Sequence, residues 1–334
     1  MRMNHIAEIA AKLPEYGLDA ITRDEAHYTT DGRYIEAAQE QITGARVSLI
    51  TAQNGHLAQA RAYLEEKGLH NVGFESGAMT VDAHHRYTQE LPCILTPAQT
   101  LLDELRASKD EAELAVMRHA QEITDEAFKA ILNFIRPGLT EREIAARLVY
   151  ELMRHGGEKV SFDPIVAAGP NGSKPHAVPG DQVVDTGMFI TMDFGCKVEG
   201  YCSDMTRTVA VGFATEEMQK VYQTVLSAQQ AGIAAARAGI TGRDVDAAAR
   251  AVIAAAGYGA YFGHSFGHGV GVEIHEAPNA SPSNEQPLPA GAVISAEPGV
   301  YLPGKLGVRI EDVILLTETG CRNLTKAPKE LLIL

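Results

Sequence analysis

Thr191-Met-Asp-Phe-Gly-Cys-Lys-Val-Glu-Gly-Tyr-Cys-Ser-Asp-Met-Thr-Arg-Thr208 contains two strand-like runs around a short turn, with one aspartate in each run. A tight hairpin centred on Val198 and Glu199 would set Asp193 directly opposite Asp204, and a bulge at either glycine would change that register. Opposed residues have Cβ atoms about 4.5–5.5 Å apart, where like charges repel. Two outcomes are open: a buried dicarboxylate pair that needs a proton or a cation, or two solvated aspartates at strand ends.

A second pair of carboxylates, Glu297 and Glu311, lies on either side of a turn with Pro and Gly at residues 303–307. Glu297 follows the apolar run Ala292-Val-Ile-Ser-Ala296 almost directly. A carboxylate at the end of such a strand is costly to bury unless it is paired. The alternative is a surface glutamate at a strand end.

Histidines cluster between these carboxylates. His268 lies in Gly263-His-Ser-Phe-Gly-His-Gly-Val-Gly271, flanked by His264 and His275, and His176 lies upstream in Lys174-Pro-His-Ala-Val178. Glycines let a backbone approach a ligand closely. A lone histidine is usually structural, but three within twelve residues favour a functional site.

The same stretch also fits the Gly-x-Ser-x-Gly motif of serine hydrolases, with Ser265 at its centre. That motif needs a strand before it and a helix after it. Gly269, Gly271 and Pro278 oppose a following helix, so we do not expect a serine nucleophile.

Five residues therefore form the candidate metal-ligand set: Asp193, Asp204, His268, Glu297 and Glu311. Four carboxylates and one imidazole suit hard or borderline divalent ions. Two such ions held close together activate a water and polarise a carbonyl at once, which makes a hydrolase the leading hypothesis.

Composition narrows the alternatives. The 334 residues carry a formal net charge of −14, which disfavours binding to phosphate backbones, so we expect no nucleic-acid partner. The four cysteines form no Cys-x-x-Cys pair and are typical of reduced thiols in a cytosolic protein. Neither a signal-peptide core nor an apolar stretch of 18 residues is present, so we expect no membrane association and a cytoplasmic location.

The chain is expected to form two domains. Residues 1–105 predict a small α/β domain, and residues 106–334 predict an α+β domain with helices on a mainly antiparallel sheet. In the first domain, apolar spacing predicts a helix that ends near Gly17. Further helices are predicted at residues 33–43 and 57–67, and strands at 47–51 and 71–75. In the second domain, Thr140 and Glu143 predict a capping box.

An internal repeat is visible in the second domain. Arg136-Pro-Gly-Leu-Thr-Glu-Arg-Glu143 matches Arg237-Ala-Gly-Ile-Thr-Gly-Arg-Asp244 at a constant offset of 101 residues. Each copy precedes an alanine-containing helical stretch that ends in glycine. We interpret the repeat as two related halves with a site where they meet. The alternative is that Thr-capped helix turns resemble one another by chance.

The second domain resembles the pita-bread metallopeptidases, the family of methionine aminopeptidase, aminopeptidase P and Xaa-Pro dipeptidase. The resemblance rests on five ordered motifs: Thr191–Gly195, Gly200–Thr208, Gly263–Gly271, Ser295–Gly299 and Gly307–Asp312. The Asp-Met-Thr-Arg-Thr run and the His176 segment are similar to the proline-specific branch. The resemblance implies the pita-bread (creatinase/aminopeptidase) fold with pseudo-two-fold halves, behind a small N-terminal domain. That domain is shortened here between Ala20 and Ile21.

The resemblance also implies roles at the site. Asp204 and Glu311 would bridge two metal ions, Asp193 would bind one ion, and His268 and Glu297 the other. The ions are expected to be Mn²⁺, with Co²⁺ or Zn²⁺ as alternatives.

Catalytic and substrate-binding roles are implied in the same way. Glu297 would move the proton of a bridging water, and His264 and His275 would stabilise the tetrahedral intermediate. His176 and Arg309 would position the proline side of the substrate, although Arg309 could instead orient Glu311.

The implied activity is hydrolysis of Xaa-Pro bonds in peptides with proline in second position. We favour an aminopeptidase P-like enzyme, with Xaa-Pro dipeptidase (prolidase) as the alternative, and expect a homodimer. A non-catalytic pita-bread binding protein and a metal-free hydrolase such as creatinase are disfavoured, because all five ligand positions are filled.

Overall fold

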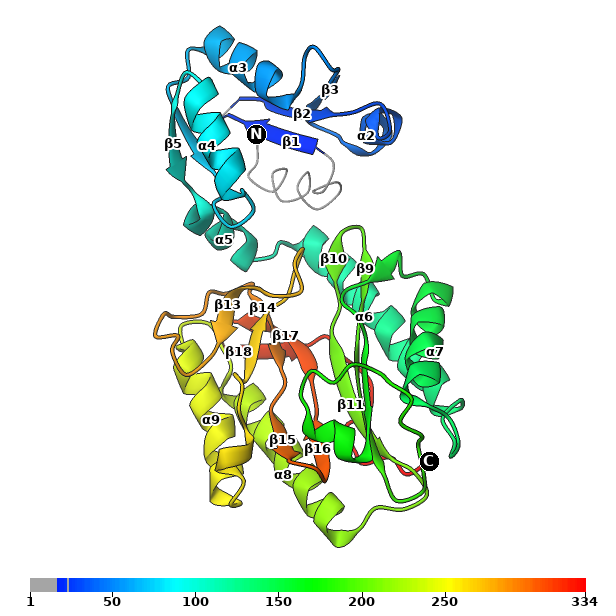
Figure 1. The fold of residues 1–334 in the computed structure, drawn as a ribbon. Helices are drawn as coiled ribbons and strands as arrows, with labels where there is room; N and C mark the ends of the chain where they lie inside the picture. Colours follow the sequence, from blue (N-terminus) through cyan, green and yellow to red (C-terminus); the bar gives the residue numbers. More distant parts are fainter. Residues whose placement is uncertain (1–16, 23) are drawn as a thin grey trace. The chain divides into compact units, whose positions relative to one another are not determined.

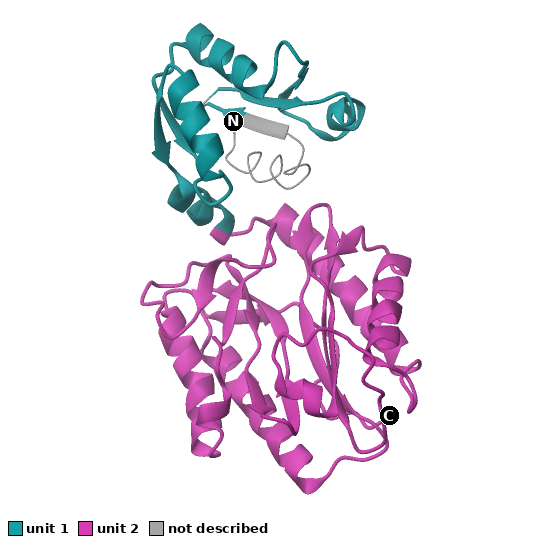
Figure 2. Cartoon of the chain, viewed as in Figure 1, with its two compact units in different colours: residues 1–106 teal, residues 107–334 magenta. Residues whose placement is uncertain are grey.

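The computed structural model describes residues 17–22 and 24–334, with side chains from residue 20 onward. The chain divides into two compact units, Met1–Arg106 and Ala107–Leu334 (Figure 2). The helix expected before Gly17 lies outside the described residues. Within the described part of the chain, no helix has both the length and the apolar character needed to cross a bilayer.

Unit 1 has the expected α/β character. Its strands are β1 (Gly17–Ile21), β2 (Ala26–Thr30), β3 (Arg46–Leu49), β4 (Asn71–Phe74) and β5 (Ile94–Pro97). Its helices are α2 (Ile35–Gln41), α3 (His56–Lys67), α4 (Val81–Glu90) and α5 (Gln99–Ala107). The two helices and two strands predicted here form as α2, α3, β3 and β4. Strands β1 and β2 form an antiparallel pair whose last partners are Ile21 and Ala26.

Each helix of unit 2 named below is preceded by a residue whose side chain caps it. They are α6 (Glu111–Leu132), α7 (Glu141–Arg154), α8 (Glu216–Ala235) and α9 (Gly242–Ala255). Thr140 accepts a hydrogen bond from the N–H of Glu143, and the Glu143 carboxylate accepts one from the N–H of Thr140. This confirms the predicted capping box. Losing such a cap typically costs about 1 kcal/mol.

The remaining elements of unit 2 are mostly short strands. They are β6 (Lys159–Val160), β7 (Ile165–Ala168), η1 (Gly169–Ser173), β8 (Phe189–Phe194), β9 (Cys196–Val198), β10 (Tyr201–Cys202), β11 (Met205–Ala210), η2 (Gly259–Tyr261), β12 (Gly267–Gly269), β13 (Glu276–Ala280), β14 (Val293–Ala296), β15 (Gly299–Leu302), β16 (Leu306–Arg309), β17 (Asp312–Thr317) and β18 (Gly320–Asn323). The main sheets run β11-β8-β7 and β13-β12-β14-β17-β18. Every named strand pair described in unit 2 is antiparallel, which agrees with the expected α+β fold.

The internal repeat is also visible in the backbone. Gly138 donates its N–H to the carbonyl of Val184, and Gly239 donates its N–H to the carbonyl of Leu288, each at 2.9 Å. In both copies the partner donates back to the residue after the glycine, at 2.8 Å. The two halves therefore start their capped helices, α7 and α9, from the same local geometry.

Each half buries its own apolar core. One cluster joins α6 and α7 to β8 and β11, and the other joins α8 and α9 to β14 and β17. Figure 1 shows the two helix pairs on opposite sides of the strands of unit 2. Strands β8 and β11 are buried along their whole length. Polar side chains at the ends of such strands must therefore find partners inside the protein.

Candidate metal centre

The turn between β9 and β10 sets the register of the first aspartate hairpin. Glu199 and Gly200 have φ values of 45° and 84°, and Val198 pairs with Tyr201. Two consecutive positive φ angles are typical of a two-residue type I′ turn, in which glycine is favoured. The expected centre at Val198 and Glu199 was therefore wrong by one residue.

As a result, the two aspartates are diagonal neighbours instead of directly opposed residues. Asp193 pairs with Thr206, and Asp204 comes two residues before Thr206. A register shift of two residues keeps both side chains on the same face of the hairpin. The strands approach closely at Gly195, where a Cβ atom would lie 2.0 Å from the carbonyl oxygen of Ser203.

The second carboxylate pair joins the first through the backbone. Strands β14 and β17 pair Ala296 with Asp312, so Glu297 and Glu311 are the next residues beyond that pair. The N–H of Glu311 donates to the carbonyl of Thr206 at 3.1 Å. The two hairpins are therefore linked where the carboxylates leave the sheets.

His268 lies on the short strand β12, and its Nε2 lies close to the carboxylates of Asp204 and Glu297. Its Nδ1 lies 3.0 Å from the carbonyl oxygen of Gly269. A carbonyl only accepts hydrogen bonds, so Nδ1 carries a proton and, in the neutral ring, Nε2 has a free lone pair. The N–H of His268 donates to Ser295 Oγ at 3.0 Å, and Ser295 Oγ donates to Glu297 Oε1 at 3.0 Å.

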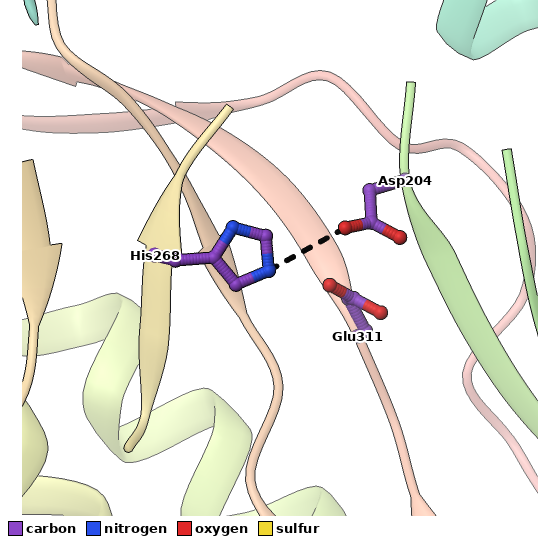
Figure 3. Close-up of side chains that lie close together, drawn as sticks. All are labelled: Asp204, His268 and Glu311. Carbon is purple, nitrogen blue, oxygen red and sulfur yellow. Dashed lines mark ion pairs between the residues drawn. The ribbon is translucent and has the colours of Figure 1, made fainter. Parts of the chain in front are cut away.

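Three of the five expected ligands form a close group: Asp204, His268 and Glu311 (Figure 3). One ligand atom from each lies within 4.8 Å of the other two. His268 Nε2 lies 3.6 Å from Asp204 Oδ2 and 3.2 Å from Glu297 Oε1. Glu297 therefore joins the group through the same imidazole nitrogen.

Asp193 is connected through Arg309, which is buried. Arg309 Nη2 donates to Asp193 Oδ2 at 2.6 Å. Its Nε donates to Thr206 Oγ1 at 3.0 Å, and Thr206 Oγ1 donates to Glu311 Oε2 at 2.7 Å. In this structure Arg309 thus contacts Asp193 directly and reaches Glu311 through the hydroxyl of Thr206.

Three carboxylate oxygens of this group are buried without hydrogen-bond partners among the described residues: Asp193 Oδ1, Asp204 Oδ1 and Glu311 Oε1. A buried, unpaired carboxylate oxygen is strongly unfavourable. Three of them beside an imidazole nitrogen that a metal ion can bind in place of its proton fit a site for divalent cations, because the missing partner for each oxygen is a positive charge.

The pKa shifts within the group also favour a site for cations. Burial raises the pKa of Asp204 well above its usual range, and the neighbouring carboxylates, Glu311 first, raise it further. Burial and the charge of Glu297 likewise raise the pKa of Glu311. Burial alone would raise the pKa of Glu297, but its hydrogen bond to His268 and the charge of that ring lower it to about 2. The same pairing outweighs burial and raises the pKa of His268 to about 9.

His264 and His275 lie near this group in different settings. His264 Nδ1 lies 2.9 Å from the Ser265 carbonyl, and its Nε2 lies 2.9 Å from the hydroxyl of Tyr301. The ring centroid of His275 lies 4.2 Å from that of His268. Burial lowers the pKa of both His264 and His275.

His176 is exposed. Burial is the largest cause that lowers the pKa of His264 and His275, and the charge of His176 makes a smaller contribution in the same direction. The preceding residue, Pro175, accepts a hydrogen bond from Arg309 Nη1 at 3.2 Å. The segment that carries His176 is therefore in direct contact with the polar network of the site.

Sequence reasoning missed three contributors: Thr206, Ser295 and Tyr301. Thr206 and Ser295 lie inside motifs quoted for their acidic members, so their position was a usable signal. Tyr301 accepts from Arg309 Nη1 at 2.8 Å, but nothing in its local sequence marks it. The geometry around Ser265 agrees with the rejection of a serine nucleophile, because β12 and not a helix follows it.

The chain matches two known protein families. The profile of metallopeptidase family M24 matches residues 115–318, and that of the creatinase/prolidase N-terminal domain matches residues 14–108. An uncharacterized peptidase of Bacillus subtilis is 42% identical over 320 residues, which cover 95% of this chain and 90% of the relative.

Two solved structures are also similar over nearly the whole chain. A Xaa-Pro dipeptidase from Bacillus anthracis superposes with a TM-score of 0.93 at 38% identity, covering 100% of this chain and 94% of the other. An X-Pro aminopeptidase from Thermotoga maritima superposes with a TM-score of 0.90 at 33% identity, covering 99% and 95%.

Proposed function

Because this chain belongs to metallopeptidase family M24, it is a metal-dependent hydrolase, and we propose that it cleaves the peptide bond before proline in short peptides. The observation that supports the metal centre is the set of three buried, unpartnered carboxylate oxygens beside His268. The preference for proline rests on the similarity to Xaa-Pro peptidases. A binding protein without catalytic metal would have no need to keep these charges buried and unpaired.

We assign the ligands as the family resemblance implies. Asp204 and Glu311 would be shared between two ions, Asp193 would bind the first, and His268 and Glu297 the second. Oxygen-rich ligation favours Mn²⁺, with Co²⁺ or Zn²⁺ as alternatives. When bound, the two ions would lower the pKa of a water and polarise the substrate carbonyl.

The chain's own residues would handle protons and orientation. Ser295 Oγ holds Glu297 Oε1 at 3.0 Å, so the Glu297 carboxylate is oriented to accept the proton of the attacking water and return it to the leaving nitrogen. Both ring nitrogens of His264 already have partners, Ser265 and Tyr301. His275 is therefore the more available donor for the negative charge that develops on the carbonyl oxygen.

The length of the peptide separates two candidate activities. The sequence motifs favoured aminopeptidase P-like activity. The dipeptidase structure is somewhat more similar to this chain, at 38% identity against 33% for the aminopeptidase, which favours Xaa-Pro dipeptides instead. Longer Xaa-Pro-Yaa peptides are the second candidate.

The test uses purified protein stripped of metal with a chelator and then supplied with Mn²⁺. Xaa-Pro, Xaa-Pro-Yaa and the matching Xaa-Ala peptides are assayed side by side. Metal-dependent cleavage confined to the proline peptides is expected. Cleavage that survives chelation, or equal cleavage of the alanine peptides, would refute the proposal. Cleavage of the dipeptide alone would exclude aminopeptidase P-like activity.

Two further expectations follow from the resemblance. We propose a homodimer, which light scattering of the purified protein tests directly. We also propose a cytoplasmic location, which cell fractionation tests.

A further inference from the structure

We propose that Glu141 is a positioning residue that sets substrate affinity by holding the segment of residues 168–180, which carries His176. The inference rests on the proposed function and on the substrate-binding role that the family resemblance implies for His176. Glu141 is the first residue of α7, directly after the capping residue Thr140, and its side chain is completely buried.

Glu141 binds both ends of this segment with its two carboxylate oxygens. Oε1 accepts from the N–H of Ala168 at 2.7 Å, and Oε2 accepts from the N–H of Gly180 at 3.0 Å. Asn171 Nδ2 donates to both oxygens, at 3.1 and 3.3 Å. One side chain thus closes a loop of thirteen residues at its start and at its end.

The other face of the segment lies against the hairpin of β15 and β16. The N–H of Gly304 donates to Ser173 Oγ at 3.2 Å. A Cβ atom on Gly307 would lie 1.8 Å from the carbonyl oxygen of Gly172, so the two backbones are in close contact. This hairpin also carries Tyr301 and Arg309, so the segment connects the start of α7 with the polar network of the metal centre.

The second half of the molecule holds a histidine-bearing loop in a similar way. Asp246, buried on α9, accepts from the N–H of Phe266 at 2.9 Å and pairs with Arg250. Arg250 in turn donates to the carbonyls of Phe262 and His264, at 2.9 and 2.8 Å. In each half, a buried carboxylate on a Thr-capped helix restrains the loop that presents a histidine of the site.

The contacts of Glu141 are not those of a helix cap. The cap of α7 is formed by Thr140 and Glu143, and the side chain of Glu141 takes no part in it. All the groups that donate hydrogen bonds to the Glu141 carboxylate are neutral N–H groups of residues 168–180. An amide keeps one accepting oxygen, so Glu141→Gln must release one end of the segment or the other.

The test compares Glu141→Gln with Glu143→Gln, which makes the same chemical change at an exposed position in the same helical turn. With metal-replete enzyme and a Xaa-Pro dipeptide, Glu141→Gln is expected to raise KM about tenfold, the loss of one hydrogen bond to a charged acceptor, with kcat within about twofold. Glu143→Gln is expected to leave KM unchanged. An unchanged KM in Glu141→Gln would overturn the inference.

A double variant distinguishes positioning from a general structural effect. If Glu141 acts through His176, then Glu141→Gln combined with His176→Ala should lower kcat/KM no further than His176→Ala alone. Multiplying effects would refute the inference. If Glu141→Gln does not fold, Asn171→Ala replaces it, and a KM that does not rise in that variant counts against the proposal.

Hydrogen exchange gives a readout that does not need activity. Backbone amides of residues 168–180 should exchange faster in Glu141→Gln than in the wild type or in Glu143→Gln. If the wild type cleaves no proline peptide, the proposed function fails, while this exchange experiment still decides whether Glu141 holds the segment. Unchanged exchange would show that it does not.

Discussion

The imidazole of His268 lies 3.2 Å from Glu297 Oε1, and the two form an ion pair in the absence of metal. This pair explains why the pKa of Glu297 falls to about 2 while that of His268 rises to about 9. A metal ion would take the place of the imidazole proton. Protons and metal ions therefore compete for one set of ligand atoms, and the first prediction follows from that competition.

Metal should stabilise the protein more at higher pH. Burial and neighbouring charges raise the pKa of Asp204 and Glu311 in the metal-free fold. The folded state then binds more protons than the unfolded chain, so metal-free stability falls as pH rises through these raised pKa values. A bound metal ion would offset the repulsion between these carboxylates. The gain in Tm on adding Mn²⁺, measured by differential scanning fluorimetry, should be larger at pH 8 than at pH 6. An equal gain at both pH values would contradict the prediction.

Asp204→Asn should weaken metal binding and stabilise the metal-free protein. The substitution removes a buried carboxyl group whose ionised form is destabilised by burial and by the neighbouring carboxylates. A relief of 1 kcal/mol corresponds to about 2–4 °C in Tm for a unit of this size. Metal content by mass spectrometry should fall, while the Tm of the chelated protein should rise. A lower Tm in the metal-free variant would show that the carboxylate stabilises the fold without metal.

Glu297→Ala should abolish turnover and leave the fold largely intact. Its carboxylate is the expected proton acceptor, and the loss of such a group typically costs about 10²–10⁴ in rate. Turnover, the far-ultraviolet circular dichroism spectrum and Tm are measured together. Glu318→Ala, in an exposed turn, is the matched control and should retain full activity. Near-normal turnover in Glu297→Ala would remove this residue from the mechanism.

Lys109→Met should destabilise unit 2 strongly. Lys109 Nζ lies 2.6 Å from Glu276 Oε1, and both side chains are nearly inaccessible, at 1% and 7%. Removing the ammonium leaves a buried charge, which costs about 3–5 kcal/mol in denaturant unfolding.

Two comparison variants test the cause of the stability lost in Lys109→Met. Lys305, which pairs with Glu217 on the surface, is the control, and Lys305→Met should cost less than about 1 kcal/mol. Adding Glu276→Gln to Lys109→Met should recover most of the stability. If the double variant is no more stable than Lys109→Met, charge burial is not the cause of the loss.

The sequence by itself was sufficient for features that depend on neighbouring residues. The capping box of Thr140 and Glu143 follows from local hydrogen bonding. The helix predicted at residues 57–67 ends at Lys67, because Gly68 adopts a positive φ easily. The sequence also predicted the types of residue that would bind metal, because charged residues stand out in otherwise apolar strands. Their chemistry pointed to divalent cations before any distance was known.

Only the tertiary structure decided which groups meet and how. The hairpin register depended on which two residues take positive φ, and the pattern allowed more than one answer. Arg309 reaches Asp193 across 116 residues, and Glu141 reaches Gly180 across 39, with no periodic signal for either contact. Such contacts arise because buried polar groups must find whatever partner the packed strands bring near, and that partner is set by the fold as a whole.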